Sequence, residues 1–172
     1  MHNPSRLLDQ FCFRRGDRGV TLLELLITLL IVSILVALAA PSYLEWSSAA
    51  RVRTQTHALL SALVKGRDTA MLHRHQVRIC ASSNGATCSG ATNWAVGWLV
   101  KDLTNSTVLA TEPAISGGNT LAASVGAITF ASNGEPNVAA LFELKPKVCS
   151  GKAARSISVE LTGLTSDQAA SC

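Results

Sequence analysis

The run VTLLELLITLLIVSILVALAA, residues 20–40, sets the architecture of this chain. It holds one charged side chain, Glu24, among strong helix formers. At about 1.5 Å of rise per residue, a helix of this length extends roughly 31 Å, close to the ~30 Å hydrocarbon thickness of a bilayer. The sequence therefore predicts an apolar helix over residues 20–41 that is long enough to span a membrane.

The rest of the chain has the composition of one soluble domain. The whole sequence of 172 residues suffices for one domain, and a charged share of 15% is too low for a disordered chain. The apolar excess lies in one place, which argues against a protein that crosses the membrane many times. Residues 1–19 carry half of the net charge of +4, so no overall nucleic-acid footprint is evident. This basic flank favours a cytoplasmic N-terminus and a C-terminal part beyond the inner membrane.

An amphipathic pattern continues after Pro41, which interrupts the first helix. Apolar or small residues recur at three- and four-residue spacing: Val52, Thr56, Leu59, Leu60, Leu63, Gly66 and Ala70. The pattern predicts an amphipathic helix over residues 43–74, whose apolar face another layer must cover. Arg67 falls close to this face, so we expect it to be partly buried and paired with a carbonyl or carboxylate.

Strand-like patterns fill the remainder of the chain. Gly-, Ser- and Asn-rich turns separate five candidate strands, at residues 76–81, 94–101, 127–131, 138–144 and 156–161. Asn133-Gly134 is a hairpin signal, and Trp94, Trp98 and Phe130 are expected in the core. The predicted fold class is α+β: a long N-terminal helix packed on an antiparallel sheet, in a domain of residues 42–172.

Four of the five cysteines lie in this domain, while Cys12 lies in the N-terminal flank. An even number of cysteines in an exported domain predicts disulfides, with three possible connectivities among Cys80, Cys88, Cys149 and Cys172. We favour Cys80–Cys88, which closes a Gly/Ser loop, and Cys149–Cys172, which holds the C-terminus. The alternative is a metal site with His73 and His75, but no Cys-x-x-Cys pair is present.

Residues 49–78 carry six basic side chains against one acid, Asp68. One interpretation is a patch for anionic lipid headgroups, DNA or an acidic partner subunit. The other, which we favour, is a solvated helix face, because the basic side chains scatter around the helix. The candidate anion contacts are Arg51, Arg53, Arg74 and Lys152.

Catalytic motifs are absent from the sequence. It has no Gly-x-Ser-x-Gly elbow, no Walker loop and no His-Glu-x-x-His. We therefore predict no enzyme, no catalytic residue, no metal and no cofactor.

The N-terminal stretch RGVTLLELL, residues 18–26, resembles the cleavage motif of type IV prepilins and pseudopilins. The resemblance implies that residues 1–19 are a leader, that a prepilin peptidase cuts after Gly19, and that Val20 becomes the N-methylated first residue. Glu24 and Pro41 then fall at mature positions five and twenty-two, as in the family, where they serve subunit assembly. Val20 departs from the more common Phe. The alternatives are an ordinary signal sequence cleaved after residue 40 and an uncleaved anchor.

Glu24 also has a physical argument of its own. A carboxylate in hydrocarbon is unfavourable by several kcal/mol unless it is paired or protonated. No Lys, Arg or His lies between residues 19 and 50, which leaves a freed N-terminal amine as the candidate partner. The resemblance implies that this amine belongs to a neighbouring subunit. The alternative is an acid tolerated near the membrane surface.

Further segments resemble one branch, the FimT/GspH minor pilins and pseudopilins. They are LSALVKGRDTA at 60–70, VRIC at 77–80, WAVGWLV at 94–100 and ITFASNG at 128–134. The resemblance implies a pilin-like subunit of a type IV pilus or a type II secretion pseudopilus, which primes assembly near the filament tip. Its partners would be the prepilin peptidase, other major and minor pilins or pseudopilins, and the inner membrane. The C-terminal domain would be periplasmic.

A DNA-uptake minor pilin is the alternative function. Some members of the branch end in a basic Gly-Arg-x-Arg element, but here the matching positions read Gly163-Leu164-Thr165-Ser166. This departure weakens a DNA-receptor role for the tail, and leaves Arg51, Arg53, Arg74 and Lys152 as the residues that could contact DNA.

Overall fold

The computed structural model describes residues 19–172, apart from the side chains of residues 39–42. Most of the predicted leader, including Cys12, lies outside the described residues. The chain divides into two compact units, Met1–Ala40 and Pro41–Cys172, which are described in turn. Helix α1 (Leu22–His73) begins in the first unit and continues in the second.

The first unit is an apolar helical segment with a capped start. The hydroxyl of Thr21 accepts a hydrogen bond from the backbone N–H of Glu24 at 3.2 Å, and Thr-Leu-Leu-Glu is the sequence of a capping box, so α1 begins at Leu22. The hydroxyls of Thr28 and Ser33 donate to carbonyls of the preceding turn at 2.9 and 2.7 Å. Across the described residues, no single helix has both the length and the hydropathy expected of a membrane span. The segments Leu22–Leu38 and Tyr43–His73 meet that test only as a bent pair.

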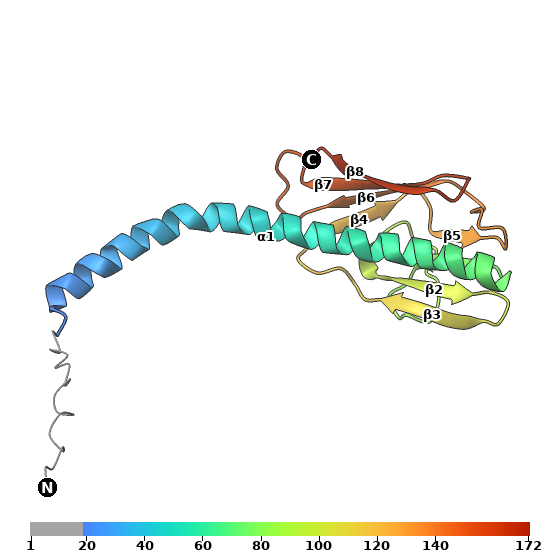
Figure 1. The fold of residues 1–172 in the computed structure, drawn as a ribbon, viewed down its shortest axis with the longest axis horizontal. Helices are drawn as coiled ribbons and strands as arrows, with labels where there is room; N and C mark the ends of the chain where they lie inside the picture. The colour runs from blue at the N-terminus through green and yellow to red at the C-terminus, as the bar shows by residue number, and fades with distance from the viewer. Residues whose placement is uncertain (1–18) are drawn as a thin grey trace, which may run out of the picture. The chain divides into compact units, whose positions relative to one another are not determined.

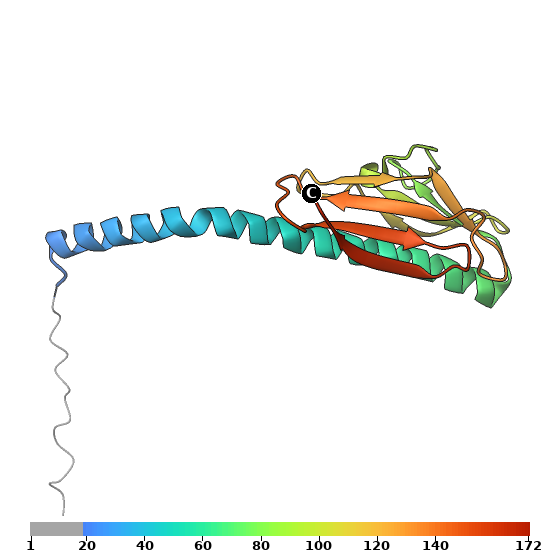
Figure 2. The same cartoon turned by 90° about the horizontal axis from the view of Figure 1, so that it is seen from above.

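The second unit contains eight strands in two antiparallel sheets. The first sheet has the order β3-β2-β1-β5, and its strands are β1 (Val77–Ala81), β2 (Trp98–Asp102), β3 (Thr107–Glu112) and β5 (Ala127–Phe130). The second sheet has the order β4-β6-β7-β8, and its strands are β4 (Thr120–Ala123), β6 (Ala140–Lys145), β7 (Ala154–Val159) and β8 (Thr165–Ala170). In Figure 1, α1 runs between β7 and β8 on one side and β2 and β3 on the other. Figure 2 shows the orange-to-red strands of the second sheet side by side.

One core joins α1 to both sheets. The helix contributes the fully buried side chains of Leu59 and Leu63, and the two sheets contribute a continuous set of apolar residues around them. Trp94, in a short 3-10 helix (Trp94–Val96), packs edge-on against Phe142 of β6 with ring centroids 4.9 Å apart. At Gly66 an added Cβ would lie 2.7 Å from Cδ1 of Ile79, so glycine allows α1 to approach β1 closely. The whole core and both disulfides lie within Pro41–Cys172, which therefore has what an independently folding domain needs.

The predicted fold class is confirmed, and so is the burial of Trp94, Trp98 and Phe130. The prediction of a single sheet was wrong, because β5 and β6 belong to different sheets. Asn133-Gly134 is therefore not the turn of a hairpin between them; the chain turns there to change sheets, with one isolated bridge from Phe130 to Pro136.

Strands β3, β4 and β8 were missed, and the predicted strand at 94–101 begins instead with a 3-10 helix. All three missed strands are edges of their sheets. An edge strand buries little and needs no clear apolar alternation, so its sequence resembles a loop.

We predict that Leu63→Ala lowers the free energy of unfolding of the domain by about 2–5 kcal/mol, because it leaves a cavity in the core. Leu72→Ala on the same helix is the matched control, since Leu72 is 79% exposed against 1% for Leu63. Urea unfolding followed by circular dichroism measures both. Equal losses for the two variants would contradict the packing of α1 described above.

Candidate functional site

The predicted processing site lies in accessible chain before α1. Val20 is 68% exposed, and an added Cβ on Gly19 would meet no atom within 4 Å. Neither residue belongs to a helix or strand. The Gly19–Val20 peptide bond is therefore free of packing within the part of the chain that the structure describes.

Glu24 lies one turn further on, at the third position of α1, and is exposed. Within residues 19–172, ion pairs join His75 to Asp102, Lys145 to Glu143 and Arg155 to Asp167, and none involves Glu24. An acid in the first turn favours a helix through its dipole, so Glu24 has a local role as well as the predicted intermolecular one. Pro41 lies within α1, but its side chain is outside those described.

The four cysteines of the second unit form two disulfides, Cys80–Cys88 and Cys149–Cys172. This is the connectivity that the sequence favoured. Because all four sulfurs are bonded in pairs, no thiolate is available for the alternative metal site with His73 and His75.

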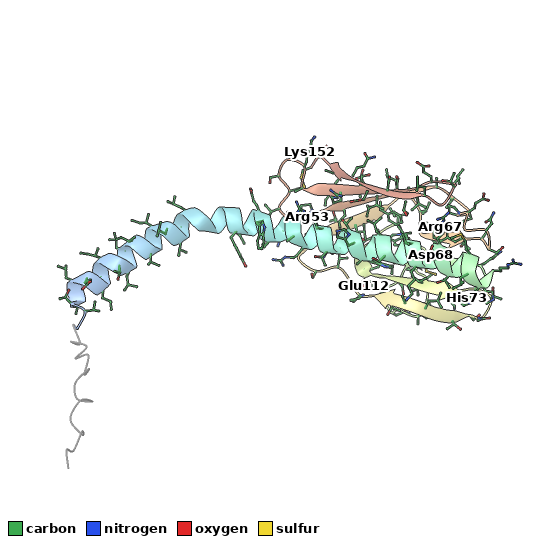
Figure 3. All side chains as sticks on the ribbon, viewed as in Figure 1. Arg53, Arg67, Asp68, His73, Glu112 and Lys152 are labelled. Atoms are coloured by element: carbon green, nitrogen blue, oxygen red, sulfur yellow. A yellow bond between two sulfur atoms is a disulfide. The ribbon has the colours of Figure 1, made fainter. Side chains whose placement is uncertain are left out.

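The predicted anion contacts do not form one surface. Figure 3 shows Arg53 and Lys152 toward the end of the second unit at which α1 enters it, whereas His73 lies at the other end. Arg74 directly follows His73, the last residue of α1. Arg74 is therefore separated from Arg53 and Lys152 by the length of the domain.

Arg67 of α1 contacts the backbone of two loops, at Gly134 and at Thr162. Its Nε donates to the carbonyl of Gly134 at 3.1 Å, and its Nη2 reaches the carbonyl of Thr162 at 3.5 Å. The prediction that Arg67 is partly buried and paired with a carbonyl is confirmed. The second of these loops directly precedes Gly163-Leu164-Thr165-Ser166, the positions that match the basic element of some other members of the branch. Here Arg67 of α1 contacts the loop through the carbonyl of Thr162.

A pair between half-buried His75 and buried Asp102 was missed in the sequence. Nδ1 of His75 lies 2.6 Å from Oδ2 of Asp102, and Oδ1 accepts the backbone N–H of Thr104 at 2.8 Å and that of Asn105 at 3.3 Å. Burial alone would raise the pKa of Asp102, but the hydrogen bonds from His75, Thr104 and Asn105 together hold it below its ordinary value. Asp102-x-Thr-Asn is a recognisable Asx turn, but nothing local indicates a partner 27 residues away.

The His75–Asp102 pair connects the segment after α1 to the end of β2. Asp102 has no nucleophile among its hydrogen-bond partners, and the described residues contain no group of three or more His, Cys, Asp or Glu side chains able to hold a metal. The pair is therefore an element of the fold.

An exposed apolar helical segment followed by a helix packed on antiparallel sheets defines a pilin-like protein. The profile of the family described as type II transport protein GspH matches residues 55–164, and that of the prokaryotic N-terminal methylation motif matches residues 14–40. The chain belongs to the GspH family and carries the prokaryotic N-terminal methylation motif.

A solved structure of a type IV minor pilin has a similar fold. The type IV minor pilin FimU of Pseudomonas aeruginosa, in a crystal of space group P21, matches with a TM-score of 0.52 and 16% sequence identity over 76% of this chain and 92% of that chain. A second FimU crystal, of space group P65, gives 0.48 and 17% over 72% and 91%. No curated protein sequence matches significantly.

We predict that the domain loses stability in acid partly through Asp102. The folded-state pKa of Asp102 is below the ordinary 3.8, so its ionised form stabilises the fold above pH 3.8, and this contribution is lost as the pH falls through the lower folded pKa. In Asp102→Asn the unfolding midpoint in urea should be lower at pH 7 and should fall less between neutral and acid pH. An unchanged pH dependence in the variant would contradict this assignment.

Proposed function

We propose that this chain is made as a prepilin, cut between Gly19 and Val20 by a prepilin peptidase, and N-methylated on Val20. Residues 20–41 would anchor it in the inner membrane, with the C-terminal domain in the periplasm. Other pilins or pseudopilins would then take it up in small numbers near the filament tip, where it primes assembly of a type IV pilus or type II secretion pseudopilus.

The exposed apolar segment carries this proposal. Every large apolar side chain from Val20 to Leu38 is at least half exposed, over all faces of the helix. Burying one such side chain is favourable by about 1.5–3 kcal/mol, so the whole segment is strongly driven out of water. Its hydroxyl groups are already hydrogen-bonded within the helix, as a lipid environment requires. Lipid would bury the apolar segment before assembly, and the apolar helices of neighbouring subunits would bury it after assembly.

Glu24 supports assembly rather than simple anchoring. In a plain anchor this acid would serve only the start of the helix, whereas an ammonium group freed at Val20 of a neighbouring subunit would supply the missing opposite charge. Such a pair would form only when two apolar segments lie side by side at a fixed offset. It would therefore select correctly aligned subunits.

Mass spectrometry of the native protein tests the processing step. We expect a chain that begins at an N-methylated Val20, and we expect Gly19→Val to accumulate at full length because a side chain is introduced at the cleaved bond. A native chain that begins at Met1, or after residue 40, would contradict the proposal.

Substitution of Glu24 tests the assembly step. Glu24→Ala and Glu24→Gln should both reach the membrane fraction but should be depleted from sheared filaments, because both remove the charge. Thr21→Ala is the matched control: it removes the cap, at about 1 kcal/mol, and keeps the acid. Immunoblots of filament and membrane fractions give the ratio. Normal incorporation of Glu24→Gln would show that the charge is not used.

A further inference from the structure

We propose that one end of the second unit binds the headgroups of anionic phospholipids. The surface, here called the basic end, consists of Arg51, Arg53, Lys147 and Lys152. It lies where α1 enters the domain, as Figure 3 shows for Arg53 and Lys152. The inference rests on the proposed function in one respect, that the chain is anchored in a membrane before assembly.

A hydrogen-bonded loop joins the separate parts of the basic end. Gln55 of α1 donates to the carbonyl of Ser116 at 2.9 Å and accepts from the side chain of Asn119 at 2.7 Å. The side-chain oxygen of Asn119 in turn accepts the backbone N–H of Lys147 at 3.1 Å. The first turns of α1 in this unit, the loop at 116–119 and the segment after β6 are thus fixed to one another.

Two glycines in this loop lie against the long basic side chains. An added Cβ on Gly117 would lie 3.1 Å from Cδ of Arg51, and one on Gly118 would lie 2.9 Å from Cδ of Lys147. The methylene stems of Arg51 and Lys147 therefore pack along the glycine pair, while both residues remain exposed. This packing reduces the entropy that the two cations would lose on binding an anionic surface.

The C-terminus positions the fourth cation. The disulfide Cys149–Cys172 and a hydrogen bond of 3.1 Å from the N–H of Cys172 to the carbonyl of Gly151 hold the segment that carries the exposed Lys152. Nearby in the chain, Glu143 of β6 is already paired with Lys145 at 3.0 Å. Among the described residues, none of the four cations forms an ion pair, so the surface keeps an excess of positive charge.

Exposed aromatic and apolar side chains accompany the cations. Tyr43 and Trp46 are 65% and 67% exposed, with ring centroids 6.1 Å apart, and Val148 is 55% exposed between Lys147 and Lys152 in the chain. Tyr and Trp are typical of membrane–water interfaces. The basic end thus combines cations with side chains of the kinds that lie at a membrane–water interface.

These features favour lipid over duplex DNA as the anionic partner. A lipid interface takes up aromatic rings and an exposed valine together with cations, whereas phosphate contacts on a duplex are made by charged and hydrogen-bonding groups and do not use a valine side chain. The basic end also directly follows the segment proposed to lie in the membrane. Arg74, at the opposite end of the domain, does not belong to this surface.

Vesicle sedimentation of the domain, residues 41–172, tests the proposal. We expect it to bind vesicles of equal parts phosphatidylglycerol and phosphatidylcholine, to release them as salt rises, and not to bind pure phosphatidylcholine. The double variant Lys147→Gln, Lys152→Gln should bind roughly 25-fold more weakly, since each cation near an anionic surface contributes on the order of fivefold. The control Lys65→Gln, Arg74→Gln removes the same charge from exposed positions elsewhere and should bind like the wild type.

Three results would overturn the proposal: no preference for phosphatidylglycerol, equal losses for the two double variants, or displacement of the domain from vesicles by a small excess of duplex DNA. In the full chain, amine-reactive footprinting should show Lys147 and Lys152, but not Lys65, protected in phosphatidylglycerol-containing membranes. Equal labelling of all three would also overturn it. If the domain does not bind vesicles but Glu24 is still needed for incorporation into filaments, the lipid contact is excluded and the proposed function is not.

Discussion

The constraint on which the rest of this molecule depends is an apolar helical segment whose large side chains stay exposed among the described residues. The large side chains from Val20 to Leu38 are at least half exposed on every face. Exposing such a large apolar surface to water is unfavourable, so lipid or the apolar helices of other subunits must cover the segment. The C-terminal domain carries no such requirement, because its core is closed within Pro41–Cys172.

The two parts of helix α1 differ in how their apolar side chains are distributed. Before residue 39 apolar side chains cover the whole circumference, whereas from Val52 onward the buried apolar side chains form a single face. On that face Gly66 brings the helix close to β1, and Arg67 draws the turns at Gly134 and Thr162 onto it. The helix is thus both the support on which the two sheets are fixed and the element that carries the domain.

The helix and the N-terminal methylation motif could be predicted from sequence because their signals are local. A 21-residue apolar run, one acid and a glycine at fixed spacing specify them within a few turns of chain. Sheet pairing could not be predicted in the same way. Strand β8, with the sequence TSDQAA, is a polar edge, and only its pairing with β7 makes it a strand. The exchange of sheets after Phe130 depends on long-range packing, and so does the contact of His75 with Asp102.

The disulfide between Cys149 and Cys172 has a practical consequence for tracking this subunit in cells. An affinity tag joined directly to Cys172 would emerge from the cross-link. A tag at the other terminus would be discarded with the leader if the chain is cleaved after Gly19. The β2–β3 turn offers a better insertion point: Ser106 is exposed and has a φ of 58°, and it lies just beyond the backbone groups that bond to Asp102. An epitope placed there would report on the subunit without disturbing either end.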